Sequence, residues 1–481
     1  MFSKSFIFAM VVALGAYSYL KYYGPTEEDR IKDNIISAWH TIIREPSSKF
    51  RRVAVGVNAD VDLIVPGIEL LNALNVVPGD KSDHESLDSL SKLQETFALF
   101  FSRGSAAERY FADADLYRTI VQAAESLASV QSFIGGNAAL MANKVSSLFP
   151  DTEIQFVGPV GPGLQKLLPK SIKVPAESLV AQDEVHLIME YKVGDRWGND
   201  VTPVASRFIT SHDESNAQAN MLETFFASLN GFNADLVLLS GLHMMEGLEA
   251  DMFDQRLQVL VSGLESVPSH VPVHLELASM AKEDYLHGIL DKVLPHVSSL
   301  GLNEQEIAFS SSVADGPHTE LFKGQSGQPE IHKISDMILW ILRTYGYSNK
   351  RTQSRLTRVH FHSLTYHIIG VIPSAWQNTE SAVAAGTRLA GRQACDVDHL
   401  SSKIADLKIP LKFKLFSEDQ ERLFDGTKPV LSWDREGFHF AFSPVLVCKN
   451  PEKTVGLGDS ISSTGLLYSQ YHHSYRVPKS S

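Results

Sequence analysis

Short apolar segments that alternate with helical stretches are the feature that most constrains the fold of this chain. The segments read RRVAVGVNA, EIQFVGPVG, ADLVLLSGL, VPVHLELAS, VSSLGLN and LTRVHFHSL. Several are apolar at successive positions, which is the pattern of strands buried on both faces of a parallel sheet. Because helical stretches separate them, the sequence predicts an α/β fold with a doubly wound large domain.

One stretch has a different pattern and predicts a second, smaller domain. Residues 181–213 read as antiparallel strands with a turn at VGDRWGND and without a long intervening helix. A chain of 481 residues also exceeds the size at which a single core keeps growing. The predicted division is a large domain over 28–66, 131–178 and 214–471, a small lid domain over 67–130 and 179–213, and a flexible tail over 472–481.

The N-terminus predicts a targeting segment. Lys4 precedes the uncharged stretch SFIFAMVVALGAYSYL, and KYYG follows it. This pattern is typical of a signal peptide, and the stretch is only slightly shorter than a membrane anchor. For residues 1–23 both alternatives stand, and either one predicts entry into the secretory pathway. If the segment is retained, it attaches the protein to a membrane.

Two cysteines, Cys395 and Cys448, are present in the chain. In an oxidising compartment such a pair can form a disulfide. The alternative is that both are buried small apolar side chains, which is how free cysteines usually behave.

Charge and hydropathy exclude some classes of protein. The 43 basic and 56 acidic side chains give a net charge of −13, and the sequence contains no local basic patch. Phosphate backbones are repelled by such a chain, so no nucleic-acid partner is expected. A mean hydropathy of −0.06 excludes a protein with many membrane spans.

The segment TVGLGDSISSTGLLYSQY, residues 454–471, carries the first candidate site. Gly456, Leu457 and Gly458 leave backbone N–H groups open to an anion at the positive end of a predicted helix. Asp459 beside them could accept the proton of a substrate hydroxyl, as phosphoryl transfer to an alcohol requires. The alternative is that Asp459 is an ordinary helix N-cap.

Two further motifs at predicted strand ends are candidate metal sites. Asn303 and Glu306 in GLNEQE suit indirect binding of Mg²⁺, which keeps most of its waters, or else form a capping box. His274 and Glu276 alternate in VHLELAS, so they share one strand face and could bind a metal or join a hydrogen-bonded network.

A rival interpretation is a hydrolytic zinc site. His360 and His362 in RVHFHSLTYH share a strand face, as His274 and Glu276 do. No HExxH motif or other sharply spaced ligand set accompanies these histidines. Imidazoles near strand ends are more often satisfied by hydrogen bonds, so the zinc interpretation is disfavoured.

Three segments predict a site for a small polar substrate. They are GVNADVD, GSAAERYF with Glu108, and SFIGGNAAL with Gly135, Gly136 and Asn137. A sugar needs carboxylate and amide groups for its hydroxyls, together with glycines that let the ring come close. Each segment alone is a weak signal, since Gly-Gly-Asn is also a turn sequence, but their joint occurrence indicates sugar binding.

Over residues 50 to 472 the chain resembles the eukaryotic ADP-dependent glucokinases of the ribokinase-like superfamily. The matching segments are GVNADVD, AAERYF, GGNAAL, GPVGP, LSGLHMMEG, PVHLELASM, SLGLNEQE, HFH, SPVLVCKN and TVGLGD. The resemblance implies a nucleotide-binding large α/β/α domain with a smaller sheet-rich lid, and an endoplasmic reticulum setting. It also implies transfer of the β-phosphoryl group of ADP to the 6-hydroxyl of glucose, which gives glucose 6-phosphate and AMP.

The resemblance also implies residue roles. Asp459 corresponds to the catalytic base, with Gly456, Leu457 and Gly458 as the anion hole. Asn303 and His274 correspond to residues that organise metal and phosphate. One Mg²⁺ per subunit is implied, held by Glu276, Glu306 and Asp459.

For the sugar, the resemblance implies contacts from Asn58, Asp62, Glu108, Gly136 and Asn137. Two positions depart from the archaeal members of the family. An acid, Asp60, occupies the middle of an N-x-N-x-D pattern, and Asn137 stands where those members have glutamine. Arg207, in SRFIT, is expected to approach the phosphates from the lid.

Three functions remain open from the residues alone. The first is an ADP-dependent glucose kinase, the second an ATP-using kinase of the ribokinase type, and the third an inert sugar-binding protein. No GxxxxGK[ST] segment is present, which disfavours a P-loop kinase. The expected partners are glucose and ADP, and the expected state is a monomer.

Overall fold

The computed structural model describes residues 26–323, 329–452 and 456–476. The whole predicted signal or anchor segment, 1–23, therefore lies outside the described residues, as do residues 477–481 of the predicted tail. Within the described ranges, no helix combines the length and the apolar character that crossing a bilayer demands.

The chain divides into two compact units along lines other than those predicted. The first unit contains the described residues of Met1–Lys49, Asp315–Leu342 and Arg358–Ser481, and the second contains Phe50–Ala314 and Arg343–Thr357. The segments predicted as a small lid domain lie inside the second unit. The predicted large domain and lid domain therefore do not coincide with the two compact units, and the predicted bounds stay a prediction.

In the second unit, a run of parallel strands confirms the predicted parallel sheet. Its order is β14-β13-β12-β1-β6-β7, and every neighbouring pair is parallel. The apolar runs are buried, with β12 and β13 buried at every position. The strands are β1 (Arg52–Val57), β6 (Glu153–Val157), β7 (Ile172–Lys173), β12 (Leu236–Ser240), β13 (Val273–Glu276) and β14 (Ser299–Leu302).

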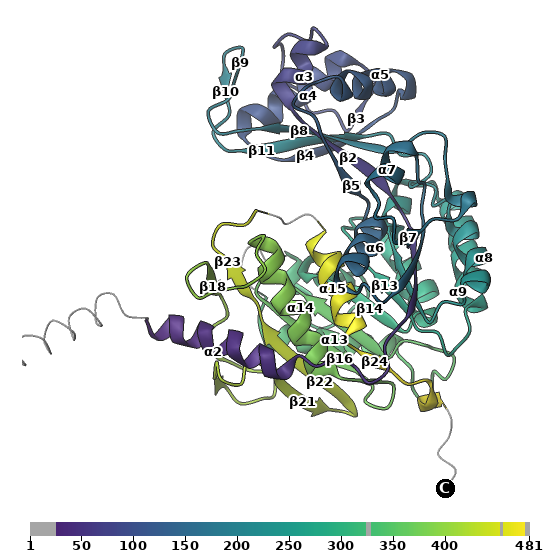
Figure 1. Ribbon diagram of the computed structural model, residues 1–481, viewed down its shortest axis with the longest axis vertical. Helices are drawn as coiled ribbons and strands as arrows, with labels where there is room; N and C mark the ends of the chain where they lie inside the picture. Colours follow the sequence, from purple (N-terminus) through teal and green to yellow (C-terminus); the bar gives the residue numbers. More distant parts are fainter. Residues whose placement is uncertain (1–25, 324–328, 453–455, 477–481) are drawn as a thin grey trace, which may run out of the picture. The chain divides into compact units, whose positions relative to one another are not determined.

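The helices that connect these strands along the chain pack against the sheet. Helices α6 and α8 contact β1, and α8 and α9 lie side by side (Figure 1). The helices of this part are α6 (Asn137–Leu148), α7 (Pro162–Leu167), α8 (Leu222–Phe232), α9 (Ala250–Ser266), α10 (Glu283–Gly288) and α11 (Glu304–Val313).

A second sheet in the same unit has the order β3-β4-β11-β8-β2-β5. The antiparallel pairing of β8 with β11 and of β9 with β10 confirms the prediction for residues 181–213. The strands of this sheet are β2 (Asp60–Pro66), β3 (Ser86–Leu87), β4 (Ala107–Phe111), β5 (Gln131–Gly135), β8 (Val185–Tyr191) and β11 (Ser206–Ser211). Strands β9 (Arg196–Trp197) and β10 (Asp200–Val201) form a separate two-stranded sheet.

Helices cover one face of this second sheet and leave the other free of helices of its own. Helices α3 (Gly67–Ala73), α4 (Leu90–Arg103) and α5 (Ala114–Glu125) lie on the covered face (Figure 1). Their core is aromatic: the Phe97 ring meets the rings of Phe101, Tyr191, Trp197 and Phe208 at centroid distances of 5.4–6.1 Å.

Strands β2 and β5 belong to the second sheet, although the sequence analysis assigned 28–66 and 131–178 to the large domain. The predicted strand RRVAVGVNA corresponds to β1, which ends at Val57, and a separate strand, β2, begins at Asp60. Val61, Leu63 and Val65 of β2 are buried, whereas Asp62 and Ile64 are only half-buried. This alternation is the pattern of a sheet with helices on one face only.

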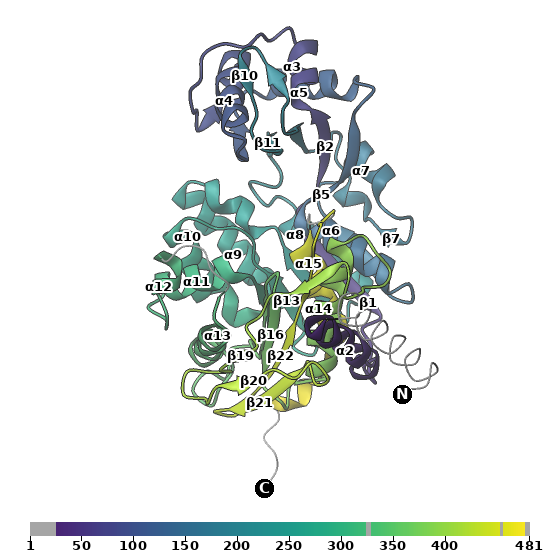
Figure 2. The same ribbon diagram turned by 90° about the vertical axis from the view of Figure 1, so that its left-hand side faces the viewer.

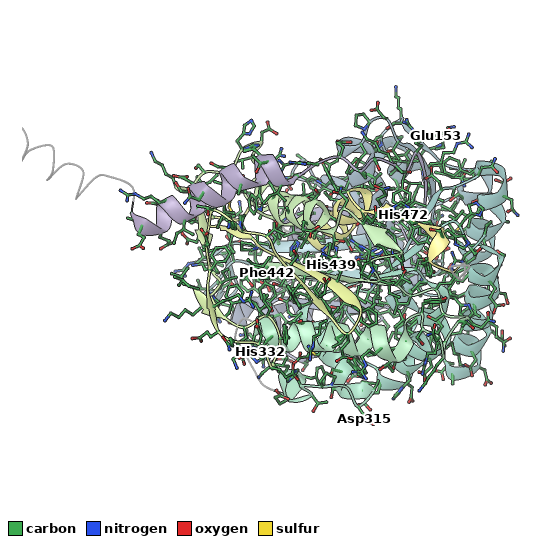
Figure 3. The ribbon with its side chains drawn as sticks, turned by 90° about the horizontal axis from the view of Figure 1, so that it is seen from below. Glu153, Asp315, His332, His439, Phe442 and His472 are labelled. Carbon is green, nitrogen blue, oxygen red and sulfur yellow. A yellow bond between two sulfur atoms is a disulfide. The ribbon has the colours of Figure 1, made fainter. Side chains whose placement is uncertain are left out.

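The first unit contains antiparallel strands in the order β21-β22-β16-β15. The segment LTRVHFHSL was grouped with the parallel strands by its apolar character, but β15 pairs with β16 in the antiparallel sense. Helix α13 lies on one side of these strands, and α14 lies on the other (Figure 2). Phe442 of β22, which is labelled in Figure 3, has its ring centroid 5.6 Å from that of Tyr366 and 5.3 Å from that of Phe413.

The elements of the first unit have the following bounds. The helices are α2 (Glu27–Ile42), α12 (Glu320–Lys323), α13 (Ile331–Tyr345), α14 (Thr379–Ala394) and α15 (Leu457–Leu467). The strands are β15 (Arg358–His362), β16 (Tyr366–Val371), β17 (Trp376–Gln377), β18 (Ala405–Leu407), β19 (Lys412–Phe413), β20 (Arg422–Leu423), β21 (Leu431–Arg435), β22 (Phe438–Pro444), β23 (Leu446–Cys448) and β24 (Gln470–Tyr471).

Cys395 and Cys448 form a disulfide, which settles the alternative that the sequence left open. Cys395 follows the last residue of α14, and Cys448 ends β23. The bond closes a segment of the first unit with a sequence separation of 53 residues.

Helices α14 and α15 meet β15 and β16 through glycines that lie against buried imidazoles. A Cβ atom on each glycine would come within 3.3 Å of the facing ring, so a larger residue would push the helix outward. The facing pairs are Gly386 with His367, Gly458 with His362, and Gly465 with His360.

We expect Gly465→Ala to destabilise the protein, because its Cβ would lie 2.8 Å from Cε1 of His360. Overpacking of this kind costs about 1–3 kcal/mol. The matched control is Gly231→Ala in α8, where a Cβ meets nothing within 4 Å. Alanine there should stabilise by about 0.5–1 kcal/mol, since glycine is the poorer helix former. Calorimetric melts test both, and equal shifts for the two variants would contradict the packing described for α15.

Candidate active site

Helix α15 begins in a turn that leaves backbone donors open. Gly456 is the N-cap and has φ +61°, a left-handed conformation that glycine adopts without strain. The first bond in the helix runs from the N–H of Ser460 to the carbonyl oxygen of Gly456, at 3.0 Å. The N–H groups of Leu457, Gly458 and Asp459 therefore have no acceptor within the helix, as expected for a first turn. Such a first turn is the feature on which the predicted anion hole depends, and anion binding here stays a prediction.

Asp459 is the third residue of α15 and is not its N-cap. The ordinary N-cap alternative is therefore wrong for this residue. Its side chain is almost fully buried, with 4% exposed. A buried carboxylate in the first turn is stabilised by the positive end of the helix dipole.

The histidines beneath α15 do not support the zinc interpretation. His360, His362 and His367 are buried, with ring centroids 5.6–6.3 Å apart. Burial lowers the pKa of His367 well below its ordinary value, and His362 lowers it further, so His367 is neutral. Among the described residues, Asp60, Asp62 and His186 form a group whose ligand atoms lie close enough together to hold a metal ion, and this group does not include these three histidines.

Asn303 and Glu306 form a complete capping box at the start of α11. The Asn303 N–H donates to Glu306 Oε2 at 2.8 Å, and the N–H groups of Gln305 and Glu306 donate to Asn303 Oδ1 at 2.9 and 3.1 Å. The Asn303 side-chain amide also donates to Glu306 Oε1 at 2.8 Å. The capping box that the sequence offered as the alternative is therefore confirmed. A carboxylate held in this way can still bind Mg²⁺ through water.

His274 and Glu276 interact with each other at the end of β13. His274 Nε2 lies 3.1 Å from Glu276 Oε2, and Nδ1 lies 2.9 Å from Ser299 Oγ on β14. Both residues are buried. Since β13 and β14 are neighbours in the sheet, Glu276 and Asn303 occupy adjacent strand ends, as predicted.

Three of the predicted site residues, Asp62, Glu108 and Arg207, lie on the helix-free face of the second sheet. Asp62 of β2 lies beside His186 of β8 in the strand register, and Glu108 and Arg207 are exposed on β4 and β11. Burial raises the pKa of the Asp62 carboxyl, His186 and Arg207 oppose this rise, and Glu108 adds to it. The four side chains therefore act on one another electrostatically.

Two residues of this face were missed from the sequence. His186 Nε2 lies 2.9 Å from Asp213 Oδ2. Burial lowers the pKa of His186, but Asp60 and Asp213 raise it well above its ordinary value. Burial also raises the pKa of Asp60 to about 8. Only the strand register brings His186 beside Asp62, and nothing in the local sequence indicates that register.

Asn58, Gly136 and Asn137 lie at the junction of β1 with α6. Asn58 is buried, and its Oδ1 accepts the N–H of Ala138 at 2.9 Å, in the first turn of α6. Gly136 is the N-cap of this helix, and Asn137 is its first residue. Asn58 therefore positions the start of α6, and its predicted contact with sugar remains a prediction.

A pocket in the second unit lies apart from the predicted site residues. It is lined in part by Tyr117, Arg118, Glu184, Val185 and His212. None of the residues predicted to bind sugar, phosphate or metal lines it. In the second unit, the predicted residues lie on the helix-free face of the second sheet, at the ends of β13 and β14, and at the start of α6. Asp459 and its turn belong to the first unit.

Comparisons with known proteins agree with this architecture. Residues 51–468 match the ADP-specific phosphofructokinase/glucokinase conserved region. The chain is 45% identical to an ADP-dependent glucokinase of Bos taurus, over 91% of this chain and 88% of that protein. It is 40% identical to a probable ADP-dependent glucokinase of Caenorhabditis elegans, over 95% of this chain and 92% of that protein.

Among solved structures, a hypothetical ADP-dependent phosphofructokinase from Pyrococcus horikoshii OT3 has the same fold. It aligns with a TM-score of 0.67 over 88% of this chain and 98% of its own, at 17% identity. The predicted α/β fold class is thereby confirmed. From the match to the conserved region and the identity to the curated relatives, the chain belongs to the ADP-specific phosphofructokinase/glucokinase family.

Proposed function

We propose that this protein is an ADP-dependent glucokinase, which transfers the β-phosphoryl group of ADP to the 6-hydroxyl of D-glucose. The products are glucose 6-phosphate and AMP. One observation carries the proposal: the chain matches a glucokinase of this type over 91% of its length at 45% identity. The buried Asp459 at the open start of α15 supplies the chemistry that such a transfer needs.

Asp459 acts as the general base in this proposal. A carboxylate that accepts the proton of the 6-hydroxyl makes the alcohol oxygen a better nucleophile as the bond to phosphorus forms. The N–H groups of Leu457 and Gly458 donate to the oxygens of the transferred group, where negative charge develops. Because these donors are fixed in a helix turn, they do not have to reorganise during the reaction.

Glucose is preferred over a sugar phosphate because the helix-free face of the second sheet carries negatively charged carboxylates. Asp62 and Glu108 accept hydrogen bonds from neutral hydroxyls, whereas they would repel the phosphate of fructose 6-phosphate. The family includes phosphofructokinases, so this is the second candidate activity. Arg207 is an exposed cation on this face, and we assign it to the nucleotide phosphates.

Mg²⁺ is the proposed cofactor, with one ion per subunit. Glu276 and Glu306 offer oxygen ligands, and hydrogen bonds from His274 and Asn303 hold both carboxylates in place. This donor chemistry fits Mg²⁺, which prefers carboxylate oxygens and water. When bound, Mg²⁺ neutralises phosphate charge. The chain's own residues orient the nucleotide and accept the proton.

We also propose that the protein enters the secretory pathway and resides in the endoplasmic reticulum. The apolar N-terminal stretch flanked by lysines supports this location. The disulfide between Cys395 and Cys448 agrees with an oxidising compartment. Membrane attachment follows if the stretch is retained.

A coupled assay for glucose 6-phosphate tests the donor and the acceptor. We expect turnover with ADP and glucose, and little with ATP and glucose or with ADP and fructose 6-phosphate. Turnover with ATP alone would identify an ATP-using kinase, preference for fructose 6-phosphate would identify a phosphofructokinase, and no turnover with either donor would favour an inert sugar-binding protein.

Asp459→Asn should lower kcat by about 10²–10⁴-fold, the usual contribution of a general base. The shift in melting temperature that glucose produces should persist, since the amide removes proton acceptance and keeps the side-chain size. Asp398→Asn, an exposed acid of the same unit, is the matched control and should keep full activity. A variant that loses folding and activity together would indicate a structural role for Asp459.

Glu276→Gln should raise the Mg²⁺ concentration needed for half-maximal rate by about 10–100-fold, since the loss of one charged oxygen weakens the site. Exposed Glu177→Gln in the same unit serves as the control. Activity titrations against Mg²⁺, and abolition of activity by a chelator, provide the measurement. An unchanged Mg²⁺ requirement would remove Glu276 from the metal site.

A further inference from the structure

Asp60, Asp62 and His186 converge on the helix-free face of the second sheet. Asp60 and Asp62 alternate on β2, so both side chains lie on one face, and His186 pairs with Asp62 in the strand register. One potential ligand atom from each side chain lies within 4.8 Å of the others. All three residues belong to one compact unit.

An orphaned oxygen is the second feature of this group. Asp60 is 2% exposed, and its Oδ1 has no hydrogen-bond partner. A buried carboxylate oxygen without a donor is costly, so its persistence points to a ligand that it binds. Gly135 leaves room for it, because a Cβ there would lie 1.9 Å from Asp60 Oδ1 and 2.9 Å from Asp62 Oδ1. The two carboxylates therefore converge above this glycine.

The distance from His186 to Asp60 fits a shared ion. His186 Nδ1 and Asp60 Oδ1 are 3.8 Å apart, which is too long for a hydrogen bond. Two ligand atoms that bind one zinc ion at about 2.1 Å lie about 3.4 Å apart at a tetrahedral angle and at most about 4.2 Å apart. The observed separation falls within this interval.

Asp213 orients the imidazole for this purpose. The contact of 2.9 Å between His186 Nε2 and Asp213 Oδ2 lets Nε2–H donate to the carboxylate, which leaves the Nδ1 lone pair facing Asp60. A carboxylate behind a ligating histidine is the usual support of a protein metal site. A bound cation would displace the protons that otherwise neutralise the negative charge of the Asp60 and Asp62 carboxylates.

From this geometry we propose that Asp60, Asp62 and His186 bind a divalent transition-metal ion, with Asp213 as the support of His186. Two carboxylates and one imidazole suit Zn²⁺ better than Mg²⁺, which takes oxygen ligands. The site is therefore distinct from the Mg²⁺ site at Glu276 and Glu306. It goes beyond the proposed glucokinase activity and does not depend on it.

The site has a consequence for sugar binding if the proposed function also holds. Asp62 serves both the ion and, in that proposal, a sugar hydroxyl. An ion bound by Asp62 would remove that acceptor, so Zn²⁺ and glucose would compete. Zinc would then act as an inhibitor that raises the KM for glucose.

Isothermal titration of the chelator-treated full chain with Zn²⁺ tests the site. We expect a site that Asp60→Asn weakens by at least about 10-fold, because it removes a charged ligand. Asp213→Asn should weaken it less, through loss of support for His186. Asp88→Asn, an exposed acid on the same unit, should leave the titration unchanged. Melting temperatures check that each variant is folded.

X-ray absorption on the zinc-loaded wild-type chain gives a result that needs no variant. We expect a first shell of oxygen and nitrogen at about 2.0–2.1 Å, with outer-shell scattering from one imidazole. Zinc affinity that Asp60→Asn leaves unchanged, a spectrum without imidazole, or no binding at 100-fold excess of Zn²⁺ would overturn the proposal.

Glucose added to the zinc titration separates this proposal from the proposed function. If Asp60→Asn weakens zinc binding and glucose weakens it too, both the site and its shared use of Asp62 are supported. If Asp60→Asn weakens zinc binding and glucose leaves it unchanged, the site is still supported, and the result counts only against the sugar contact of Asp62.

Discussion

The packing of α15 on strand β15 is the constraint on which the position of its first turn depends. Gly458 lies against His362 one residue before Asp459, and Gly465 lies against His360 two turns later. Because neither glycine has a side chain to hold the helix away, α15 lies close to the strand along its length. The position of the strand thereby fixes where the open N–H groups and the buried carboxylate lie. The proposed catalytic role of Asp459 thus depends on core packing in the first unit.

Electrostatics plays the corresponding role in the second unit. The helix-free face of its second sheet carries Asp60, Asp62 and Glu108, and burial raises the pKa of the first two. His186 and Arg207 offset part of that charge. A face of this kind has many acceptors and few donors, which suits neutral hydroxyl groups or a cation and disfavours anions. The sheet itself is stable because its other face packs an aromatic core around Phe97.

The sequence predicted the elements whose pattern is local. The apolar runs of β1, β12 and β13 and the antiparallel strands of 181–213 were readable from period and length alone. Glu276 and Asn303 lie at the ends of β13 and β14, as expected, whereas Asp60 and Asp62 lie within β2 of the second sheet. The capping box of Asn303 and Glu306 was also readable, because both partners lie within one turn. Asp459 was recognisable as a helix-start residue, although its place as third residue of α15 needed the structure.

Features that depend on distant pairing could not be read in this way. The sequence does not show that β1 and β2 belong to different sheets, because sheet membership depends on which distant strands each one pairs with. Residues 28–66 were therefore placed in one domain as a whole. The antiparallel sense of β15 has no signature in LTRVHFHSL. His186 and Asp213 come to the helix-free face of the second sheet only through strand register. The sequence does not indicate which residues will be neighbours across strands. The pairing of Cys395 with Cys448 was one of two open alternatives until the structure showed the bond.

The central claim is that Asp459 removes the proton from the 6-hydroxyl of glucose. A crystal structure with glucose and a non-hydrolysable ADP analogue tests it most directly. The account predicts an Asp459 carboxylate oxygen within about 2.6–3.2 Å of that hydroxyl, with the first-turn N–H groups of α15 directed at the β-phosphate. A carboxylate directed away from both ligands would contradict the account.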